Sequence, residues 1–214
     1  MRLMRRQFWN REATERSFRQ LERLSKSVDF VLIGGWAVYL YTGAQMSQDI
    51  DIVIGYESLG YFRQFGLKDS EGIRMKTSIV DGTVIDLFIE EYSDRDLPFP
   101  ASYLLNNYVT VNGFKIATKE QLLLLKLWGY FSPDEIKHRK DIIDVLSLLF
   151  YAGIDMKKVK ELAKRYKIDR RKSLDALLEY LDRGRGLEEF ILESGEDYSR
   201  LRKKWVSEIR RTFG

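Results

Sequence analysis

The sequence contains no cysteine, a single histidine and only three prolines. Without cysteine the chain forms no disulfide and offers no thiolate to a metal, and one histidine leaves little scope for a zinc site. No run of eighteen apolar residues occurs, and residues 1–6 lack the pattern of a signal peptide. We therefore expect a cytoplasmic protein without membrane contact, in which a bound metal would be held by oxygen atoms.

What the sequence does contain is a strand-rich first half and a helical second half. The 214 residues, 44% of them hydrophobic, suffice for one large domain or two small ones. The hydrophobic patterns predict an α+β fold, with a mixed β-sheet and flanking helices in residues 1–117 and a C-terminal helical domain in residues 118–214. The expected strands are residues 30–33, 49–54, 73–80 and 83–90, with a hairpin at 108–117; the expected helices are residues 12–26, 36–41 and 57–65, and most of the chain after 118.

Two carboxylates interrupt one of these strands, in the run Ser47-Gln48-Asp49-Ile50-Asp51-Ile52. Side chains two apart on a strand share a face, so Asp49 and Asp51 should emerge together while the isoleucines cover the other face. Like charges this close repel each other in a half-buried setting unless a cation neutralises them. Oxygen ligands favour a hard ion, so we expect Mg²⁺ or Mn²⁺.

A third carboxylate, Asp86, is the only charge inside the strand expected at residues 83–89. Asp81-Gly82 lies between this strand and the preceding one and is a strong hairpin signal. Three carboxylates on neighbouring strands can hold two metal ions about 3.5–4 Å apart, which activates an attacking oxygen and stabilises a leaving pyrophosphate. The acidic residues thus point to nucleotidyl transfer.

Gly34-Gly35 follows the first expected strand and precedes a short helix. A glycine pair can simply serve a strand-to-helix turn, because glycine tolerates backbone angles that other residues avoid. The same turn also lets backbone N–H groups at a helix N-terminus approach a phosphate. Given the carboxylates, we favour phosphate contact.

The combination of Gly34-Gly35, Asp49-x-Asp51 and Asp86 resembles the signature of the nucleotidyltransferase superfamily, the fold shared with polymerase-β-type enzymes. Residues 119–127 and 139–145 are similar to the branch that contains the AbiEii-type toxins and related prokaryotic nucleotidyltransferases. The resemblance covers about residues 28–150.

This resemblance implies transfer of a nucleoside monophosphate from an NTP to an acceptor, with release of pyrophosphate and the nucleotide lying between the two domains. Asp49 and Asp51 would hold both metals, and Asp86 would bind the catalytic metal and help to deprotonate the acceptor. Gly34, Gly35 and Ser47 would cradle the triphosphate.

One position departs from the branch, whose members often carry Arg-x-Ser/Thr-x-Asp-x-Asp. Here Gln45 stands at the position of the arginine. A cationic contact to nucleotide or acceptor is therefore lost in this interpretation. The alternative to an enzyme is a non-catalytic nucleotide- or RNA-binding module of the same fold, against which the three intact carboxylates argue.

Two lysines of the helical half are further candidates for phosphate binding. Lys126 lies in a segment that is apolar nearly all round, so its ammonium must find an anion or reach water. The candidate anions are a nucleotide phosphate and a structural carboxylate. Lys140, Asp141 and Asp144 fall on one polar stripe, where Lys140 could contact phosphate and Asp141 could orient it. We expect His138, which lies off this stripe, at the surface.

The acceptor is the least determined part of the prediction. The resemblance to toxin-type enzymes implies RNA, including the 3′ end of tRNA. Basic helices would suit such an acceptor, and residues 118–214 carry 22 Lys and Arg against 17 Asp and Glu. The same charges could equally form a solvated helix surface. A small hydroxylated molecule of the antibiotic type is the alternative acceptor. A further alternative is a toxin that a partner antitoxin protein holds inactive. The densest basic cluster comprises Lys157, Lys158, Lys160, Lys164, Arg165, Lys167, Arg170, Arg171 and Lys172.

Overall fold

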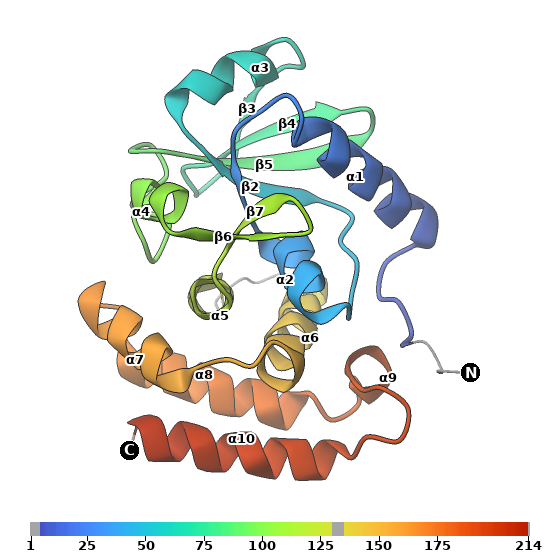
Figure 1. Cartoon of the computed structure of the whole chain (residues 1–214), viewed down its shortest axis with the longest axis vertical. Helices are drawn as coiled ribbons and strands as arrows, with labels where there is room; N and C mark the ends of the chain where they lie inside the picture. The colour runs from blue at the N-terminus through green and yellow to red at the C-terminus, as the bar shows by residue number, and fades with distance from the viewer. Residues whose placement is uncertain (1–4, 130–134, 214) are drawn as a thin grey trace. The chain divides into compact units, whose positions relative to one another are not determined.

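The computed structural model describes residues 5–129 and 135–213, and Figure 1 shows their arrangement. The strands are β1 Val31–Ile33, β2 Ile50–Ile54, β3 Lys68–Asp69, β4 Lys76–Val80, β5 Thr83–Ile89, β6 Tyr108–Val111 and β7 Phe114–Ala117. The helices are α1 Arg11–Leu24, α2 Gly34–Thr42, η1 Tyr56–Ser58, α3 Leu59–Arg63, α4 Ala101–Asn106, α5 Lys119–Trp128, α6 Glu135–Tyr151, α7 Met156–Arg165, α8 Arg170–Arg183, α9 Glu188–Ile191 and α10 Tyr198–Phe213.

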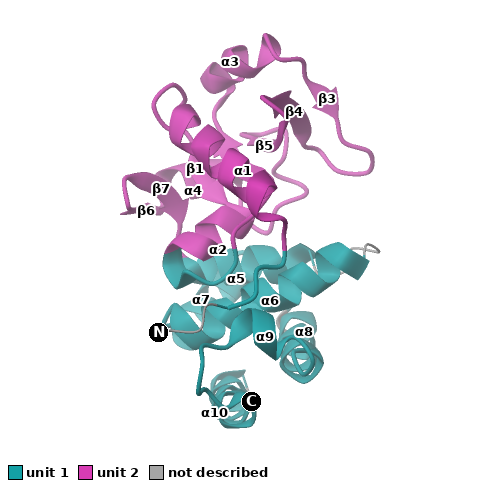
Figure 2. Ribbon diagram, turned by 90° about the vertical axis from the view of Figure 1, so that its right-hand side faces the viewer, with its two compact units in different colours: residues 1–8, 41–45, 119–214 teal, residues 9–40, 46–118 magenta. Residues whose placement is uncertain are grey.

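The chain forms two compact units, which Figure 2 distinguishes by colour. One, here called the sheet unit, comprises residues 9–40 and 46–118. The other, the helical unit, comprises residues 1–8, 41–45 and 119–214. The domain boundary was expected after residue 117, and the long segment of the helical unit begins at Lys119. Residues 1–8 and 41–45 were expected in the first domain but belong to the helical unit.

The sheet unit contains one seven-stranded mixed sheet in the order β3-β4-β5-β2-β1-β7-β6. The pairs β2/β5 and β1/β7 are parallel, and the remaining neighbours are antiparallel. Helix α1 packs against β5, and α4 packs against β2. The prediction of an α+β fold with a mixed sheet and flanking helices is confirmed.

Both expected hairpins are present, and their turn residues explain them. Asp81 and Gly82 have φ angles of 49° and 74°, and Asn112 and Gly113 have 49° and 85°. Positive φ at both central residues is what a two-residue type I′ turn requires, and its twist matches that of the flanking strands. The Asp81-Gly82 turn therefore sets the β4–β5 register, with Val80 opposite Thr83.

Apolar packing holds the sheet unit together. Isoleucines and leucines of β2 and β5 are fully buried on one face of the sheet, among them Ile52, Ile85 and Leu87. Helix α1 is tied to α2 by the Trp36 indole, whose Nε1 donates a 2.8 Å hydrogen bond to Ser17 Oγ. The sheet face that carries these apolar residues is thus closely packed, and Asp51 and Asp86 lie on the opposite face.

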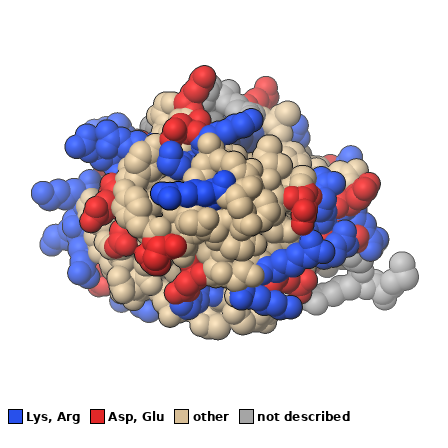
Figure 3. Space-filling model, turned by 90° about the horizontal axis from the view of Figure 1, so that it is seen from above, with Lys and Arg blue, Asp and Glu red and all other residues tan. Residues whose placement is uncertain are grey.

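The helical unit is built around α5, whose Leu122, Leu123 and Leu124 are fully buried. Helix α5 contacts α6, α7 and α8, and α10 packs against α7 and α8. In the described part of the chain no helix is both long and apolar enough to cross a membrane. On the face drawn in Figure 3, which is the view of Figure 1 from above, basic and acidic side chains lie interspersed among uncharged residues.

Candidate functional site

Two of the three predicted carboxylates lie side by side at the middle of the sheet. In the parallel pair β2/β5, Asp51 is directly opposite Asp86. Neighbouring strands are about 4.8 Å apart and opposed residues share a face, so the two carboxylates emerge together. Both are half-buried, whereas their strand neighbours Ile50, Ile52 and Ile85 are buried. The register thus places Asp51 and Asp86 on one face of the sheet, and the role predicted for them stays a prediction.

Gly34 lies against the Asp51 carboxylate at the turn from β1 into α2. Its φ of +67° lies in the left-handed region, which favours glycine. A Cβ built on Gly34 would overlap the carboxylate and would come within 2.8 Å of the Asp51 Cβ. The backbone at the start of α2 can approach the acidic pair closely only because residue 34 has no side chain.

The Asp86 carboxylate accepts a hydrogen bond from a side chain that was not predicted from the sequence. Thr77 of β4 is opposite Asp86, and its Oγ1 donates a 2.8 Å hydrogen bond to Asp86 Oδ1. Thr77 Oγ1 is also 3.1 Å from Ser70 Oγ. The hydrogen bond restricts the orientation of the carboxylate. The signal was available, because counting outward from the Asp81-Gly82 turn pairs residue 77 with residue 86.

The other site residues predicted in the sheet unit all precede Asp51 in the sequence. Asp49 is half-buried and lies in the bend just before β2, which begins at Ile50 rather than at Asp49 as expected. Ser47 is buried in the α2–β2 connection, and Gly35 is buried in the first turn of α2. Among residues 5–129 and 135–213, no three or more Asp, Glu, His or Cys side chains are grouped closely enough to hold a metal ion.

The donor chemistry of Asp51 and Asp86 nevertheless fits a hard divalent ion. Two carboxylates side by side supply charged oxygen ligands, and Mg²⁺ in proteins is commonly bound by one or two carboxylates, with water and substrate phosphates completing its coordination. Asp49 is the third predicted ligand, and its participation stays a prediction. The protein residues that would hold a metal are thus Asp51 and Asp86, with Asp49 the candidate addition.

The two predicted phosphate-binding lysines lie in a buried charge network of the helical unit. Lys126 Nζ of α5 is 2.7 Å from Asp141 Oδ1 and 2.9 Å from Asp144 Oδ2 of α6. Lys140 forms an ion pair with Asp144 one turn along α6. The Lys126 side chain is 16% exposed and that of Asp144 only 1%. A phosphate would have to compete with carboxylates for both ammonium groups, and phosphate binding by Lys126 and Lys140 stays a prediction.

Opposing influences act on the ionisation of this network. Burial alone would raise the pKa of the Asp144 carboxyl, but the ammonium groups of Lys126 and Lys140 hold it below the ordinary value. Burial lowers the pKa of the Lys140 ammonium, and the nearby Asp144 carboxylate opposes that effect. With two ammonium groups beside it, Asp144 is ionised at neutral pH, and the network is held by charge as well as by hydrogen bonds.

The expectation that His138 lies at the surface is wrong. Its residue exposure is only 9%, its ring packs 5.5 Å from the Tyr180 ring, and Arg183 Nη1 lies 2.7 Å from His138 Nε2. Since arginine only donates hydrogen bonds, Nε2 is the acceptor. The sequence pattern failed here because α8 covers this side of α6, and that packing cannot be read from α6 alone.

Gln45, the residue that departs from the branch pattern, is fully buried and bonded to the backbone of the helical unit. Its Oε1 accepts from Phe8 N at 2.8 Å, and its Nε2 donates to Arg6 O at 2.8 Å and to Phe190 O at 2.7 Å. The side chain thereby joins the residues before α1 to α9. An uncharged amide suits this role, since it satisfies a donor and two acceptors without burying a charge.

We predict that Gln45→Arg destabilises the protein. The substitution would bury a guanidinium and remove the acceptor for Phe8 N–H, so the free energy of unfolding should fall by at least about 2 kcal/mol. Urea unfolding followed by circular dichroism measures it. Gln64→Arg, on an exposed helix end, is the matched control and should change stability by no more than about 0.5 kcal/mol. Unchanged stability of the Gln45→Arg variant would contradict this structural role.

The basic cluster of α7 and α8 is mostly exposed. Lys157, Lys158, Lys164, Lys167 and Arg171 have exposed side chains, as do Arg165 and Lys172. Lys160 is different, because its Nζ donates to Thr212 O at 2.6 Å and thus holds the C-terminal helix. The side chain of Arg170 lies outside the described part of the structure.

Comparison with protein-family models yields no match, and comparison with curated proteins yields none either.

Proposed function

We propose that this chain is a metal-dependent nucleotidyltransferase that moves a nucleoside monophosphate from an NTP to an acceptor and releases pyrophosphate. The observation that supports it most is the side-by-side placement of Asp51 and Asp86, with the Gly34 backbone against Asp51. Bound Mg²⁺ or Mn²⁺ would neutralise phosphate charge and activate the attacking oxygen. The resemblance to the nucleotidyltransferase superfamily is part of this proposal.

Each residue of the proposed site would have a separate role. Asp51 and Asp86, with Asp49, would hold the metal. Asp86 would also accept the proton of the acceptor hydroxyl while the hydroxyl oxygen attacks the α-phosphorus and pyrophosphate leaves. Thr77 restrains the Asp86 carboxylate through its hydrogen bond. The N–H groups at the start of α2, near Gly34, contact the triphosphate, since a helix N-terminus attracts negative charge.

The proposed acceptor is RNA, with a tRNA 3′ end included, and the exposed lysines and arginines of α7 and α8 supply the positive charge that a phosphate backbone needs. A small hydroxylated acceptor and a non-catalytic binding module are the alternatives. Incubation with each labelled NTP, Mg²⁺ or Mn²⁺ and total RNA distinguishes them: label on RNA supports the proposal, and label on a small molecule or on nothing supports an alternative.

We predict that NTPs raise the melting temperature only when Mg²⁺ or Mn²⁺ is present. Without metal the triphosphate meets the negative charges of Asp51 and Asp86, and repulsion opposes binding. With metal, an NTP at about 100 times its Kd should add about 2.7 kcal/mol to the free energy of unfolding. Differential scanning fluorimetry with Mg²⁺, Mn²⁺ or EDTA measures the shift. The Asp51→Asn variant is the control and should lose most of it, whereas equal stabilisation of the wild type in EDTA would place the nucleotide elsewhere.

A further inference from the structure

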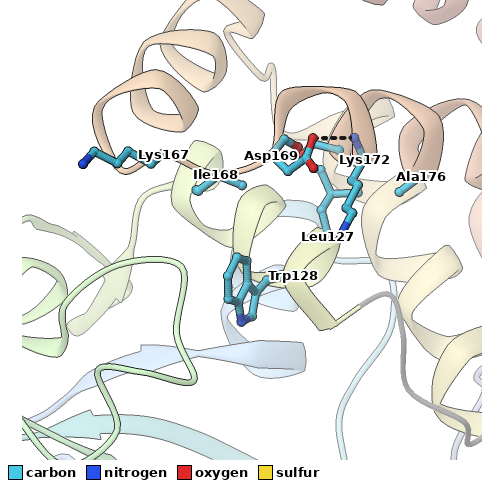
Figure 4. A pocket seen from close by; sticks show the side chains of 8 residues that line it. Leu127, Trp128, Lys167, Ile168, Asp169, Lys172 and Ala176 are labelled. Atoms are coloured by element: carbon cyan, nitrogen blue, oxygen red, sulfur yellow. Dashed lines mark hydrogen bonds between the residues drawn. The ribbon is translucent and has the colours of Figure 1, made fainter.

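A cavity of about 420 Å³ lies in the helical unit, at the end of α5 and the α7–α8 connection, remote in sequence from the carboxylates. Its volume falls in the range of small-molecule pockets, roughly 300–1,000 Å³. Figure 4 shows the side chains that line it. Leu127, Ile168 and Ala176 contribute apolar surface, and Trp128 lies at its edge as the last residue of α5.

One wall of this cavity is fixed by two consecutive helix caps. Helix α7 ends with Ile168 N–H bonded to Ala163 O at 2.9 Å and Lys167 N–H bonded to Lys164 O at 3.3 Å, the bond pattern of a Schellman motif. The next residue, Asp169, caps α8 by accepting from the N–H groups of Arg171 and Lys172. The Asp169 carboxylate is thus bound to backbone, and the wall is formed before any ligand arrives.

The side chains of the cavity combine an aromatic surface with positive charge. Trp128 is 46% exposed, which is unusual for the largest apolar side chain. In Figure 4 the Lys172 side chain runs from α8 toward Leu127, while Lys167 projects outward. Two lysines against one capping aspartate leave the lining positive, and the exposed Lys164 and Arg165 extend this charge along α7.

We propose that this cavity binds an unpaired nucleobase of single-stranded RNA, stacked on Trp128, with Lys172 contacting the adjacent phosphate. An indole beside a lysine, continuous with a basic helix surface, matches the way proteins hold single strands, where aromatic rings stack on bases and cations follow the backbone. The inference rests on the proposed function only in that the bound strand would be the acceptor. RNA binding here requires neither metal nor NTP.

The test compares a short oligouridine with an oligomer of the same length and charge that lacks one internal base, using the intact protein in EDTA. Fluorescence anisotropy gives the two affinities, and we expect the wild type to bind the complete strand roughly 5- to 100-fold more tightly. Trp128→Ala should remove this preference, and Trp128→Phe should retain most of it. Tyr56→Ala is the matched control, because Tyr56 is an exposed aromatic of the sheet unit at 53% and should have no effect.

Charge is tested with Lys172→Ala, which should make the slope of log affinity against log salt shallower by about 0.7, the value for one phosphate contact on a single strand. Equal affinity of the wild type for the complete and base-lacking strands would overturn base stacking. Displacement of the RNA by polyglutamate as effective as by polyuridylate would overturn nucleic-acid recognition in favour of an acidic protein. The Asp51→Asn variant should still bind RNA but should lose nucleotidyl transfer. RNA binding and transfer are therefore measured separately, and a failure of this proposal can be told from a failure of the proposed function.

Discussion

Replacing either Asp51 or Asp86 with asparagine is expected to lower nucleotidyl transfer at least about 100-fold while the protein stays folded. A 100-fold loss corresponds to about 2.7 kcal/mol of transition-state stabilisation, within what bound metals contribute to such reactions. Removing one of two adjacent negative charges also relieves repulsion, so the melting temperature in EDTA should hold or rise. Initial rates with labelled NTP, together with thermal melts, measure both effects.

The matched control is Asp81→Asn, at the tip of the β4–β5 hairpin. Asp81 is exposed, pairs with Arg23 at 3.0 Å and has a positive φ, which asparagine also adopts readily. Its replacement should leave both transfer and stability nearly unchanged. Asp49→Asn should match the loss seen for Asp51 if Asp49 completes the metal site. Wild-type turnover in the Asp51→Asn or Asp86→Asn variant would contradict the assignment of these residues to the active site.

Local sequence signals predicted the sheet unit well because each of them is determined by neighbouring residues. The Asp-Gly and Asn-Gly turns define hairpins through backbone angles alone. In the structure, buried and half-buried residues alternate along β5, and Asp86 is among the half-buried ones. The strands and helices that were missed, β3 and α4, are two and six residues long, too short for a periodic pattern to reveal them.

Longer-range arrangements were beyond these signals. The sequence could indicate that Lys126 needs an anion but could not tell that Asp141 and Asp144 lie within 3 Å of it. Equally, Gln45 was interpreted as a lost cation because only its position in a motif was visible. Its three hydrogen bonds go to segments 37 to 145 residues away. Such pairings depend on tertiary packing, which a local pattern does not encode.

The buried network of α5 and α6 gives the largest expected effect on stability. Asp144→Asn keeps the size of the side chain but removes the charge that faces Lys126 and Lys140. Breaking a buried ion pair by removing one partner leaves an uncompensated charge and costs about 3–5 kcal/mol. We expect the free energy of unfolding at pH 7 to fall by this amount, as measured by urea denaturation.

The pH dependence supplies a second signature of the same group. The pKa of Asp144 is lowered in the folded protein, so its contribution to stability is fully present above the ordinary aspartate value, about 3.9, and is lost as the pH falls through the lower folded pKa. The Asp144→Asn variant should lack this part of the acid-induced loss. Asp182→Asn, which removes an exposed ion pair with Arg202, is the control and should cost no more than about 1 kcal/mol. If the two variants were equally stable at pH 7, the charge network would contribute little, and Lys126 and Lys140 would become stronger candidates for contact with a bound phosphate.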